Sequence, residues 1–231
     1  AALIARGIPG EKIRVVTNGV DMTRYRPRPK DAALLASLGL EGKFVIGYIG
    51  THGLAHQLET LLEAAERLKD DPEGQDIRLL FLGDGARKSA LKDIADELDL
   101  DNVRFLDTVP KKDVARYWSL LDVAVIHLKK TPLFESVIPS KLFECLGMGI
   151  PVAHGVAGES ADIVRRERVG LTFEPEDAAE LSRILLLLHA HPEIVEGLRE
   201  NALRAASHYD RAELAGRMLD VLTAVADEGA A

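Results

Sequence analysis

Lys141 and Glu144 are the two charged side chains whose positions in the sequence best suit a chemical role. They lie three residues apart, directly after Pro139 and Ser140, in a stretch that predicts a short helix ended by glycine. A cation in the first turn opposes the helix macrodipole, so Lys141 is unfavourable there unless an anion binds beside it. The free N–H groups of a helix N-terminus and an ammonium together suit a phosphate group. A solvated Lys141 paired with Glu144, worth about 0.3 kcal/mol, explains the local pattern equally well.

Glycine or other helix-start residues follow most of the predicted strands. In an open parallel sheet the carboxyl ends of the strands share one edge, and ligands bind beyond that edge. Because glycine lets the backbone approach a ligand closely, this edge is the predicted binding site, although a tight strand-to-helix turn explains each glycine by itself. The segments concerned are Gly50-Thr51-His52-Gly53, Gly83-Asp84-Gly85, Asp107-Thr108-Val109-Pro110, Glu135 with Pro139-Ser140-Lys141, and Gly155-Val156-Ala157-Gly158-Glu159.

Other side chains at this edge leave two explanations open. His52, His127 and His154 stand at or near strand ends, where a lone histidine more often makes structural hydrogen bonds than binds a ligand. Glu135 lies in the longest predicted loop, which indicates either a function or plain exposure to solvent. The carboxylate of Glu144 can accept hydrogen bonds from ribose hydroxyls.

Several familiar sites have no counterpart in the sequence. There is no Gly-x-x-x-x-Gly-Lys-Ser/Thr loop, and Gly50 with Gly53 lacks the further glycine and the acidic residue of a dinucleotide-binding unit. No His-Glu-x-x-His pattern predicts a metal, and Asp99-Leu100-Asp101 precedes a strand at the opposite edge, where we expect a surface turn. Ser140 has no base near it in the sequence, so we do not expect a nucleophile.

Apolar strands alternate with amphipathic helices along most of the chain. This alternation predicts a parallel sheet covered on both faces, the doubly wound, Rossmann-like α/β fold. We divide the chain into a segment with an entry strand (residues 1–30), the α/β domain (31–210), and a C-terminal helix whose tail frays from residue 224 (211–231). The predicted strands are 13–17, 44–49, 77–82, 102–106, 123–128, 151–154 and 170–173, and the predicted helices are 31–38, 57–69, 86–98, 111–120, 139–147, 160–166, 177–189, 192–209 and 211–227, with a long loop at 129–138.

The composition is that of an ordinary globular protein. Hydrophobic residues make up 47% and charged residues 29%, and the net charge of −8 disfavours a general nucleic-acid or anionic-membrane surface. Cys145 is the only cysteine, so no disulfide forms within the chain, and a reducing, cytoplasmic setting fits. No signal peptide is evident, and because the chain opens without Met we expect a piece of a longer protein.

Taken together, these segments resemble the C-terminal, nucleotide-sugar-binding half of a GT-B fold glycosyltransferase of family four, the group 1 glycosyl transferases. The resemblance runs along nearly the whole chain in the family's order. Its motifs are Val16-Thr17-Asn18-Gly19-Val20-Asp21, Gly47-Tyr48-Ile49-Gly50 with the helix that follows, Phe81-Leu82-Gly83-Asp84-Gly85, Phe105-Leu106-Asp107-Thr108-Val109-Pro110, Pro139-Ser140-Lys141-Leu142-Phe143-Glu144 with Gly149-Ile150-Pro151-Val152, Gly158-Glu159, and Gly170-Leu171.

The resemblance implies a nucleotide-sugar donor, most often a UDP-sugar in the subgroup with Pro-Ser-Lys, for surface polysaccharide assembly without a metal or other cofactor. Glu144 matches the second Glu of the family's Glu-x7-Glu motif and is expected to bind the ribose. Ser136 stands where the first Glu would be, and the neighbouring Glu135 is the candidate for that donor-side, catalytic role. The family's diphosphate-gripping Arg and Lys have no match in Thr51 to His56. Lys141 is expected to neutralise the leaving diphosphate.

The same resemblance implies which residues of this chain bind the donor and which functions an N-terminal half supplies. Acceptor-side groups belong to an N-terminal half, so this chain alone is expected to bind donor without turnover, and peripheral attachment to the inner membrane face would come from that half. A GT-B-like UDP-sugar epimerase and a non-catalytic nucleotide-binding scaffold are the alternatives. The expected donor-binding residues are Gly50, Thr51, His52, Gly53, Gly83, Asp84, Gly85, Thr108, Val109, Pro110, Ser140, Lys141 and Glu144.

Overall fold

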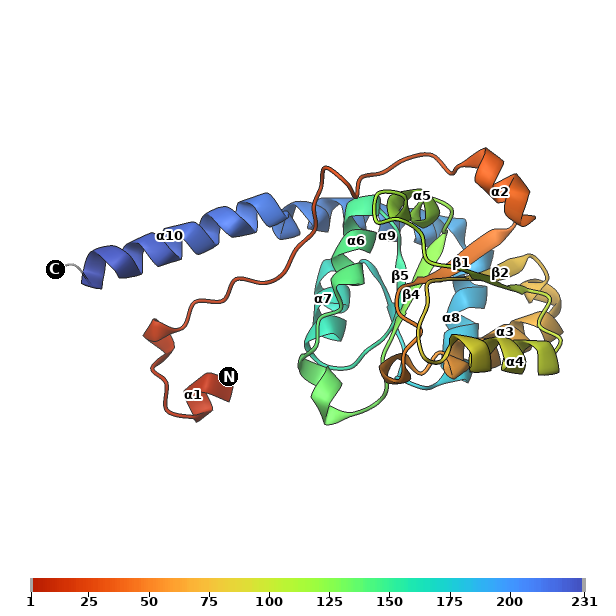
Figure 1. Cartoon of the computed structure of the whole chain (residues 1–231), viewed down its shortest axis with the longest axis horizontal. Coiled ribbons are helices and arrows are strands. Elements are labelled where there is room, and N and C mark those ends of the chain that lie inside the picture. The colour runs from red at the N-terminus through yellow and green to blue at the C-terminus, as the bar shows by residue number, and fades with distance from the viewer. Residues whose placement is uncertain (1, 230–231) are drawn as a thin grey trace.

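A computed structural model describes residues 2–229, which form a six-stranded sheet with helices on both faces (Figure 1). All paired strands are parallel, and the order across the sheet is β3-β2-β1-β4-β5-β6. The central strands are continuously apolar because helices cover both of their faces. The strands are β1 Phe44–Ile49, β2 Ile77–Leu82, β3 Val103–Leu106, β4 Val123–His127, β5 Val152–Gly155 and β6 Gly170–Thr172.

The helices divide between two hydrophobic layers, which confirms the predicted doubly wound α/β fold. One layer packs α2, α5, α6, α7 and α9 against the sheet around Trp118 and Phe143, and the other packs α3, α4 and α8 around Phe81. The helices of the first layer are α2 Ala32–Leu38, α5 Val114–Trp118, α6 Ser140–Met148, α7 Glu159–Glu167 and α9 Pro192–Ala206; those of the second are α3 Glu59–Asp70, α4 Lys88–Glu97 and α8 Ala178–Ala190.

The strand order places a switch point between β1 and β4. The chain moves outward from β1 through β2 to β3, then returns to the other side of β1 and continues through β4 to β6. The connections that leave β1 and β4 therefore diverge, and a crevice opens between them at the carboxyl edge of the sheet. The short helix η2 Leu54–His56 borders this crevice, and another short helix, η4 Pro132–Ser136, lies in the connection between β4 and α6.

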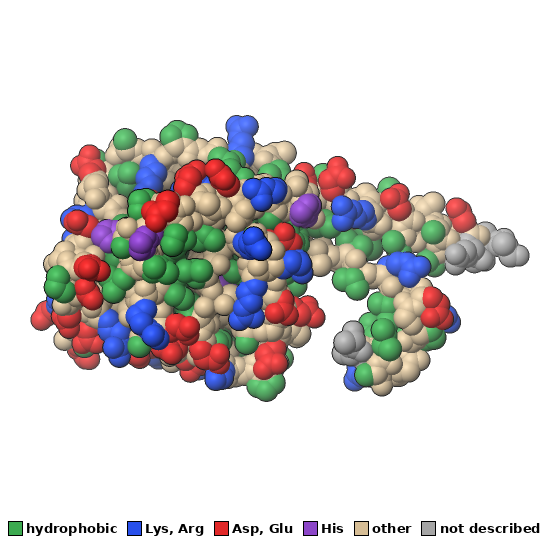
Figure 2. Space-filling model, turned by 180° about the vertical axis from the view of Figure 1, so that it is seen from behind, with side chains coloured by type: hydrophobic (Ala, Val, Ile, Leu, Met, Phe, Trp, Pro, Cys, Tyr) green, Lys and Arg blue, Asp and Glu red, His purple; other side chains and the backbone are tan. Residues whose placement is uncertain are grey.

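Both ends of the described chain project from the α/β domain in the same direction (Figure 1). The N-terminal end carries α1 Ala2–Ala5 and η1 Gly10–Lys12, and the C-terminal end is α10 Arg211–Gly229. The two ends meet beside the domain, where Val20 N–H donates to Tyr209 O at 2.8 Å and Arg211 N–H donates to Val20 O at 2.9 Å. Hydrophobic side chains are visible on both projecting segments (Figure 2), and those exposed on α10 are Met218, Leu219, Leu222 and Val225.

The predicted strand at residues 13–17 is wrong. This segment is extended, but no strand of the described chain pairs with it, and Val15 is 81% exposed. The predicted loop at 129–138 contains η4, and α10 continues to Gly229 where fraying was expected from Ala224. Residues 230 and 231 of the predicted tail lie outside the described residues. None of the helices within residues 2–229 has the length and apolar character needed to cross a membrane.

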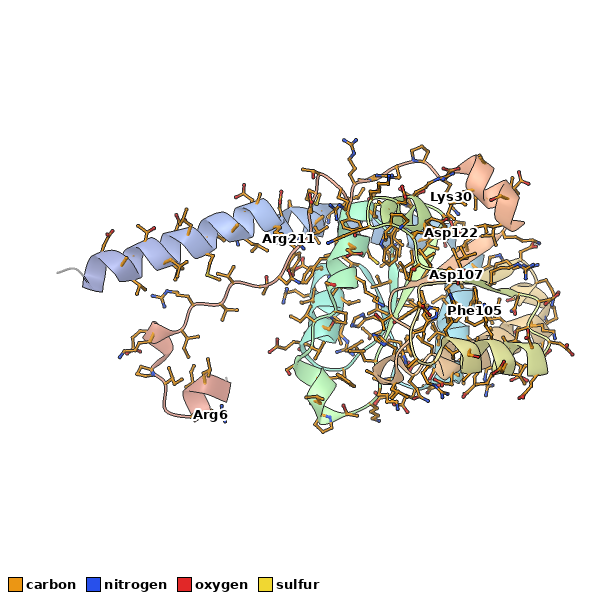
Figure 3. The ribbon with its side chains drawn as sticks, in the orientation of Figure 1. Arg6, Lys30, Phe105, Asp107, Asp122 and Arg211 are labelled. Carbon is orange, nitrogen blue, oxygen red and sulfur yellow. The ribbon has the colours of Figure 1, made fainter. Side chains whose placement is uncertain are left out.

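Helix boundaries differ from the predictions by a few residues where turns begin with glycine. The helix expected from residue 57 starts at Glu59 because Leu54–His56 forms η2 first, and the helix expected from residue 86 starts at Lys88. Lys30 fixes the linker to the domain through its ion pair with Asp122 at 2.7 Å (labelled in Figure 3). Asp122 also accepts a hydrogen bond from the N–H of Val45, so the linker is tied to the start of both β1 and β4.

Candidate functional site

A cavity of about 740 Å³ opens at the switch point between β1 and β4. It is bounded by the end of β1, the end of β4, the start of α6 and the linker before α2. This position is where ligands bind in open α/β sheets. The lining residues are Tyr25, Ile49, Gly50, Thr51, His56, Lys111, Val114, Ile126, His127, Leu128, Val137, Pro139, Ser140, Lys141 and Glu144.

A second, smaller hollow of about 210 Å³ continues from the cavity toward β2 and β3. The two hollows share Ile49, Gly50, Thr51 and Val114, so together they form one crevice. The second hollow is lined by Ile49, Gly50, Thr51, Leu82, Gly83, Asp84, Thr108, Val109 and Val114.

Glycine is required where the chain leaves the adjacent ends of the parallel strands β1 and β2, beside these hollows. Gly50 has a φ of 146° and Gly83 a φ of 147°, values that side-chain-bearing residues rarely adopt. A Cβ on Gly83 would lie 1.9 Å from the carbonyl oxygen of Gly50, and a Cβ on Gly50 would lie 2.7 Å from Nζ of Lys141. The two glycines therefore let the backbone and Lys141 come together at the floor of the crevice.

Lys88 ties the ends of β2 and β3 together below the second hollow. Its Nζ donates to the carbonyl oxygens of Gly83 at 2.8 Å and Leu106 at 3.0 Å, and to Asp107 at 2.6 Å (Asp107 is labelled in Figure 3). The charge of Lys88 lowers the pKa of Asp107 through this hydrogen bond. Lys88 thus satisfies strand-end carbonyls and fixes the shape of the crevice, while its own charge is already paired.

Lys141 is a cation without a counter-ion in the described structure. It lies in the first turn of α6, after Pro139, whose extended backbone starts the helix. Its Nζ is shielded from solvent, has no hydrogen-bond partner among residues 2–229, and lies 3.8 Å from the centroid of the Tyr48 ring. Burial lowers the pKa of Lys141 to about 8. A buried, unpartnered ammonium is costly, and an anion in the cavity would offset that cost.

Glu144 has a separate set of contacts one turn further along α6. Its Oε2 accepts a hydrogen bond from Nε1 of Trp118 at 3.1 Å, and no ion pair joins it to Lys141 in the described residues. Burial raises the pKa of Glu144, while its bonds to Trp118 and Tyr25 and the charge of Lys141 act in the opposite direction. The salt bridge that the sequence left open is therefore not the arrangement that forms, and both side chains face the cavity independently.

His127 and His56 connect the end of β4 to the turn after β1. The backbone N–H of Glu176 donates to Nε2 of His127 at 2.9 Å, so the ring proton is on Nδ1, which donates to the carbonyl oxygen of His56 at 2.8 Å. The His127 ring also stacks on Phe173, with centroids 5.7 Å apart. His127 therefore has the structural hydrogen bonds expected of a histidine at a strand end, and it holds His56 at the cavity wall.

His52 lies under the crevice instead of lining it. Its ring is fully buried against Phe81, Phe105 and Tyr48, and neither ring nitrogen has a partner among the described residues. Burial lowers the pKa of His52 to about 4, with smaller contributions from neighbouring lysines. The side chain of His52 is therefore neutral and shielded, and only its backbone supports the turn, through its N–H to Asp84 O at 2.8 Å.

The crevice brings most, but not all, of the predicted donor-binding residues together. Gly53, Gly85 and Pro110 do not line it, and Glu135 is exposed on η4, where its carbonyl packs against Gly158. His154 is fully buried in β5 and away from the lining. The predicted residues that line the crevice are Gly50, Thr51, Gly83, Asp84, Thr108, Val109, Ser140, Lys141 and Glu144.

The sequence did not point to several residues of the crevice. Tyr25 comes from the linker, and Lys111 precedes α5. Tyr48, next to the last residue of β1, belongs to a family motif but had no role assigned, and it lies under Lys141. Only the aromatic hydroxyl of Tyr48 within a buried strand was a possible signal, and it donates to the carbonyl oxygen of Thr51 at 2.9 Å. No group of three or more metal-binding side chains occurs within the part of the chain that the structure describes.

The fold and the crevice define a class of protein, a doubly wound α/β domain with a ligand site at its switch point and a cation at a helix N-terminus. A family model described as "Glycosyl transferases group 1" matches residues 32–205. The chain therefore belongs to the group 1 glycosyl transferases, as its motifs predicted.

Curated relatives agree with this assignment over about a third to a half of their own length. The chain is similar to a D-inositol 3-phosphate glycosyltransferase of Nocardia farcinica, with 29% identity over 210 residues, which cover 87% of this chain and 44% of that protein. It is also similar to a putative colanic acid biosynthesis glycosyl transferase, WcaI, of Escherichia coli, with 30% identity over 63% of this chain and 35% of that protein.

Solved structures show the same fold. HepE of Anabaena in complex with UDP matches with a TM-score of 0.82 and 21% identity, over 96% of this chain and 60% of that one. The C-terminal domain of a group 1 family glycosyl transferase (LpcC) from Francisella tularensis matches with a TM-score of 0.69 and 20% identity, over 84% of this chain and all of that chain (100%). These matches confirm the predicted GT-B-type fold, and none of the relatives named here supports the epimerase alternative.

Proposed function

We propose that this chain is the donor-binding half of a glycosyltransferase and that its crevice holds a UDP-sugar. The observation that carries the proposal is Lys141, a buried ammonium without a partner that lines a cavity at the switch point. A diphosphate placed there would meet the ammonium and the free N–H groups of the first turn of α6. UDP is the nucleotide chosen because HepE, which shares the fold, was solved in complex with UDP.

The two hollows hold different parts of the nucleotide, the ribose in the larger one and the base in the smaller one. Glu144 faces the cavity with a carboxylate held by Trp118, which suits the hydroxyls of a ribose. The smaller hollow, with Thr108 and Val109 in its lining, offers backbone and apolar contacts to a base. The backbone at Gly50 and Gly83 allows the phosphates to approach the strand ends closely.

In the reaction, the bond between the sugar and the diphosphate breaks and negative charge develops on the diphosphate. Lys141 and the N-terminus of α6 stabilise that charge, which lowers the barrier most if they are already in place before the bond breaks. The sugar is a hexose or an N-acetylhexosamine, transferred with retention to a glycan or a lipid-linked acceptor. Neither a metal nor another cofactor takes part, and Glu135 is the candidate donor-side catalytic group.

The acceptor and the remaining catalytic groups belong to an N-terminal half. This chain spans about half the length of the curated relatives it matches, with 44% of one and 51% of another covered. The apolar stripe of α10, formed by Met218, Leu219, Leu222 and Val225, and the exposed apolar residues near the N-terminus supply a surface for that half. Peripheral membrane attachment, if the acceptor is a lipid carrier, would come through the same half.

A calorimetric panel on residues 1–231 tests the donor assignment. UDP, GDP, ADP, uridine and UDP-sugars are titrated into the chain, and thermal stabilisation is recorded with each ligand. The proposal predicts that UDP and one or more UDP-sugars bind and raise the melting temperature, as expected for a ligand that binds only the folded state. Equal, negligible binding of every nucleotide would contradict it, and a preference for GDP or ADP would reject the choice of base.

A further inference from the structure

Trp118 contacts Glu144 from behind the wall of the cavity. Its indole is fully buried in the hydrophobic layer that contains α5 and α6, and it lines neither hollow of the crevice. The indole N–H donates to Oε2 of Glu144 at 3.1 Å. An indole nitrogen can only donate, and a buried one needs a partner, so this bond ties the carboxylate of Glu144 to α5 as well as to its own helix.

Tyr25 reaches the same carboxylate from the linker. Its side chain is buried and lines the cavity, and its backbone N–H donates to the carbonyl oxygen of Asp21 at 2.9 Å. Burial and the charge of the hydrogen-bonded Glu144 raise the pKa of Tyr25 to about 12. The hydroxyl therefore keeps its proton at neutral pH and donates to the carboxylate, so the linker supplies a second donor to Glu144.

The two donors leave part of the Glu144 carboxylate free for a ligand. An ionised carboxylate has about four acceptor positions on its two oxygens, and the bonds from Trp118 and Tyr25 use only some of them. The Glu144 side chain is partly exposed because it opens to the cavity. The remaining positions suit two neighbouring hydroxyls, and their direction is set by the two donors because these restrict rotation of the carboxylate.

We propose that Trp118 and Tyr25 are positioning residues that aim the carboxylate of Glu144 at both hydroxyls of the ribose, which makes the crevice select ribonucleotides over deoxyribonucleotides. This inference rests on the proposed function, because it concerns the ribose of the same donor. A Trp118 that only fills the hydrophobic layer would affect both kinds of nucleotide equally. The ratio of the two affinities therefore separates a positioning role from a packing role.

Calorimetric titrations with UDP and with deoxyuridine diphosphate (dUDP) measure that ratio. The unmodified chain is expected to prefer UDP by about tenfold or more, the effect of one hydrogen bond to a charged group. Trp118→Phe keeps an aromatic ring and removes the N–H, and Tyr25→Phe removes only the hydroxyl. Each variant is expected to lower the preference for UDP to about threefold or less, while its dUDP affinity stays within about threefold of that of the unmodified chain.

Tyr117→Phe is the matched control for both variants. Tyr117 precedes Trp118 on α5 and lines neither hollow, so its variant is expected to keep the full preference for UDP. Circular dichroism of each variant verifies that the fold is kept. If Trp118→Phe does not fold, Tyr25→Phe decides the outcome by itself, because it keeps the ring and changes no other buried group.

The fluorescence of Trp118 gives a second readout, because it is the only tryptophan of the chain. Ribose hydroxyls bound to Glu144 change the electrostatic environment of the indole N–H, so UDP is expected to shift the emission maximum. Pyrophosphate has no ribose and is expected to leave the maximum unchanged at saturation. Equal shifts with the two ligands would contradict the inference.

The outcomes distinguish this inference from the proposed function. If the unmodified chain binds UDP and dUDP equally, or if Trp118→Phe and Tyr25→Phe keep the preference for UDP, the two residues do not position Glu144 for the ribose, and the proposed function stands. If the unmodified chain binds no nucleotide, the proposed function fails and the inference fails with it.

Discussion

The ammonium of Lys141 lies 3.8 Å from the centroid of the Tyr48 ring, at the floor of the cavity. No side chain of the described residues forms a hydrogen bond or an ion pair with this ammonium. Tyr48 is 1% exposed and its hydroxyl donates to Thr51 O, so the ring cannot move away. Lys141 belongs to α6 and Tyr48 to β1, which means that the contact joins the two sides of the switch point. The cation–π contact therefore fixes the position of the Lys141 ammonium in the cavity.

Replacing Tyr48 tests whether the ring positions Lys141. Tyr48→Leu removes a cation–π contact worth about 0.5–2 kcal/mol, so UDP affinity is expected to fall by about twofold to thirtyfold. Tyr48→Phe keeps the ring and loses only the bond to Thr51, so it is expected to lower the free energy of unfolding by about 1 kcal/mol with little change in UDP affinity. Calorimetry and urea unfolding measure both quantities. A loss of affinity in Tyr48→Phe as large as in Tyr48→Leu would show that the ring is not what matters.

The pKa of Lys141 predicts opposite pH dependences for stability and for binding. It is about 8 in the folded chain, against about 10.4 for an unfolded lysine. Between these two values the unfolded chain binds more protons, so the contribution of Lys141 to the free energy of unfolding rises with pH. UDP affinity falls over the same interval because the ammonium is lost.

The variant Lys141→Met isolates these effects. Without the buried ammonium, both pH-dependent contributions are expected to disappear between about pH 8 and pH 10.4, and the chain at pH 7 is expected to be more stable by about 1–3 kcal/mol. Urea unfolding at several pH values measures this difference. A stability profile for Lys141→Met that matches the unmodified chain would mean that Lys141 is solvated and not held in the cavity.

Glu144 is expected to contribute to ribose recognition and not to phosphate binding. Glu144→Gln keeps an acceptor for Trp118 and removes the negative charge, so UDP affinity is expected to fall by about tenfold while pyrophosphate binding is kept or slightly improved. The control is Glu200→Gln on the exposed surface of α9. Competition calorimetry with UDP and pyrophosphate makes the measurement. Equal losses for both ligands would place Glu144 at the phosphates instead.

The apolar periodicity of the sequence was sufficient to predict the fold, whereas side-chain contacts across the crevice were not predictable from it. The strands β1 to β6 follow from short apolar runs, and their shared edge correctly placed Lys141 and Glu144 beside Gly50. The exception is the entry strand at 13–17. Its residues have strand propensity, but a strand also needs a partner, and propensity says nothing about partners.

The histidines after β1 show where sequence reasoning reaches its limit. His52 and His56 are in the same turn, and only packing against Phe81 and Phe105 buries the first and leaves the second at the cavity. Likewise, no local pattern relates Trp118 to Glu144, because their hydrogen bond depends on how α5 packs against α6. Such contacts depend on tertiary packing, which local sequence patterns do not specify.

Two glycine substitutions test the geometry of the strand ends. Gly83→Ala places a Cβ 1.9 Å from Gly50 O at a φ of 147°, so it is expected to lower the free energy of unfolding by more than about 2 kcal/mol and to weaken UDP binding. Gly197→Ala is the matched change in the interior of α9, where a Cβ meets nothing within 4 Å, and it is expected to stabilise the chain by about 0.5–1 kcal/mol. Urea unfolding compares the two. A tolerated Gly83→Ala would mean that the contact between Gly83 and Gly50, at the adjacent ends of β1 and β2, is looser than described.

The most direct test of the account is the titration of UDP into the unmodified chain and into Lys141→Met at pH 7. The account predicts that the unmodified chain binds UDP and that Lys141→Met, although more stable, loses affinity by about a hundredfold or more, because a charged partner of the diphosphate is gone. Uridine is expected to bind both chains equally. Equal UDP affinity in the two chains would contradict the central claim that the unpartnered ammonium of Lys141 is the phosphate-binding group of the crevice.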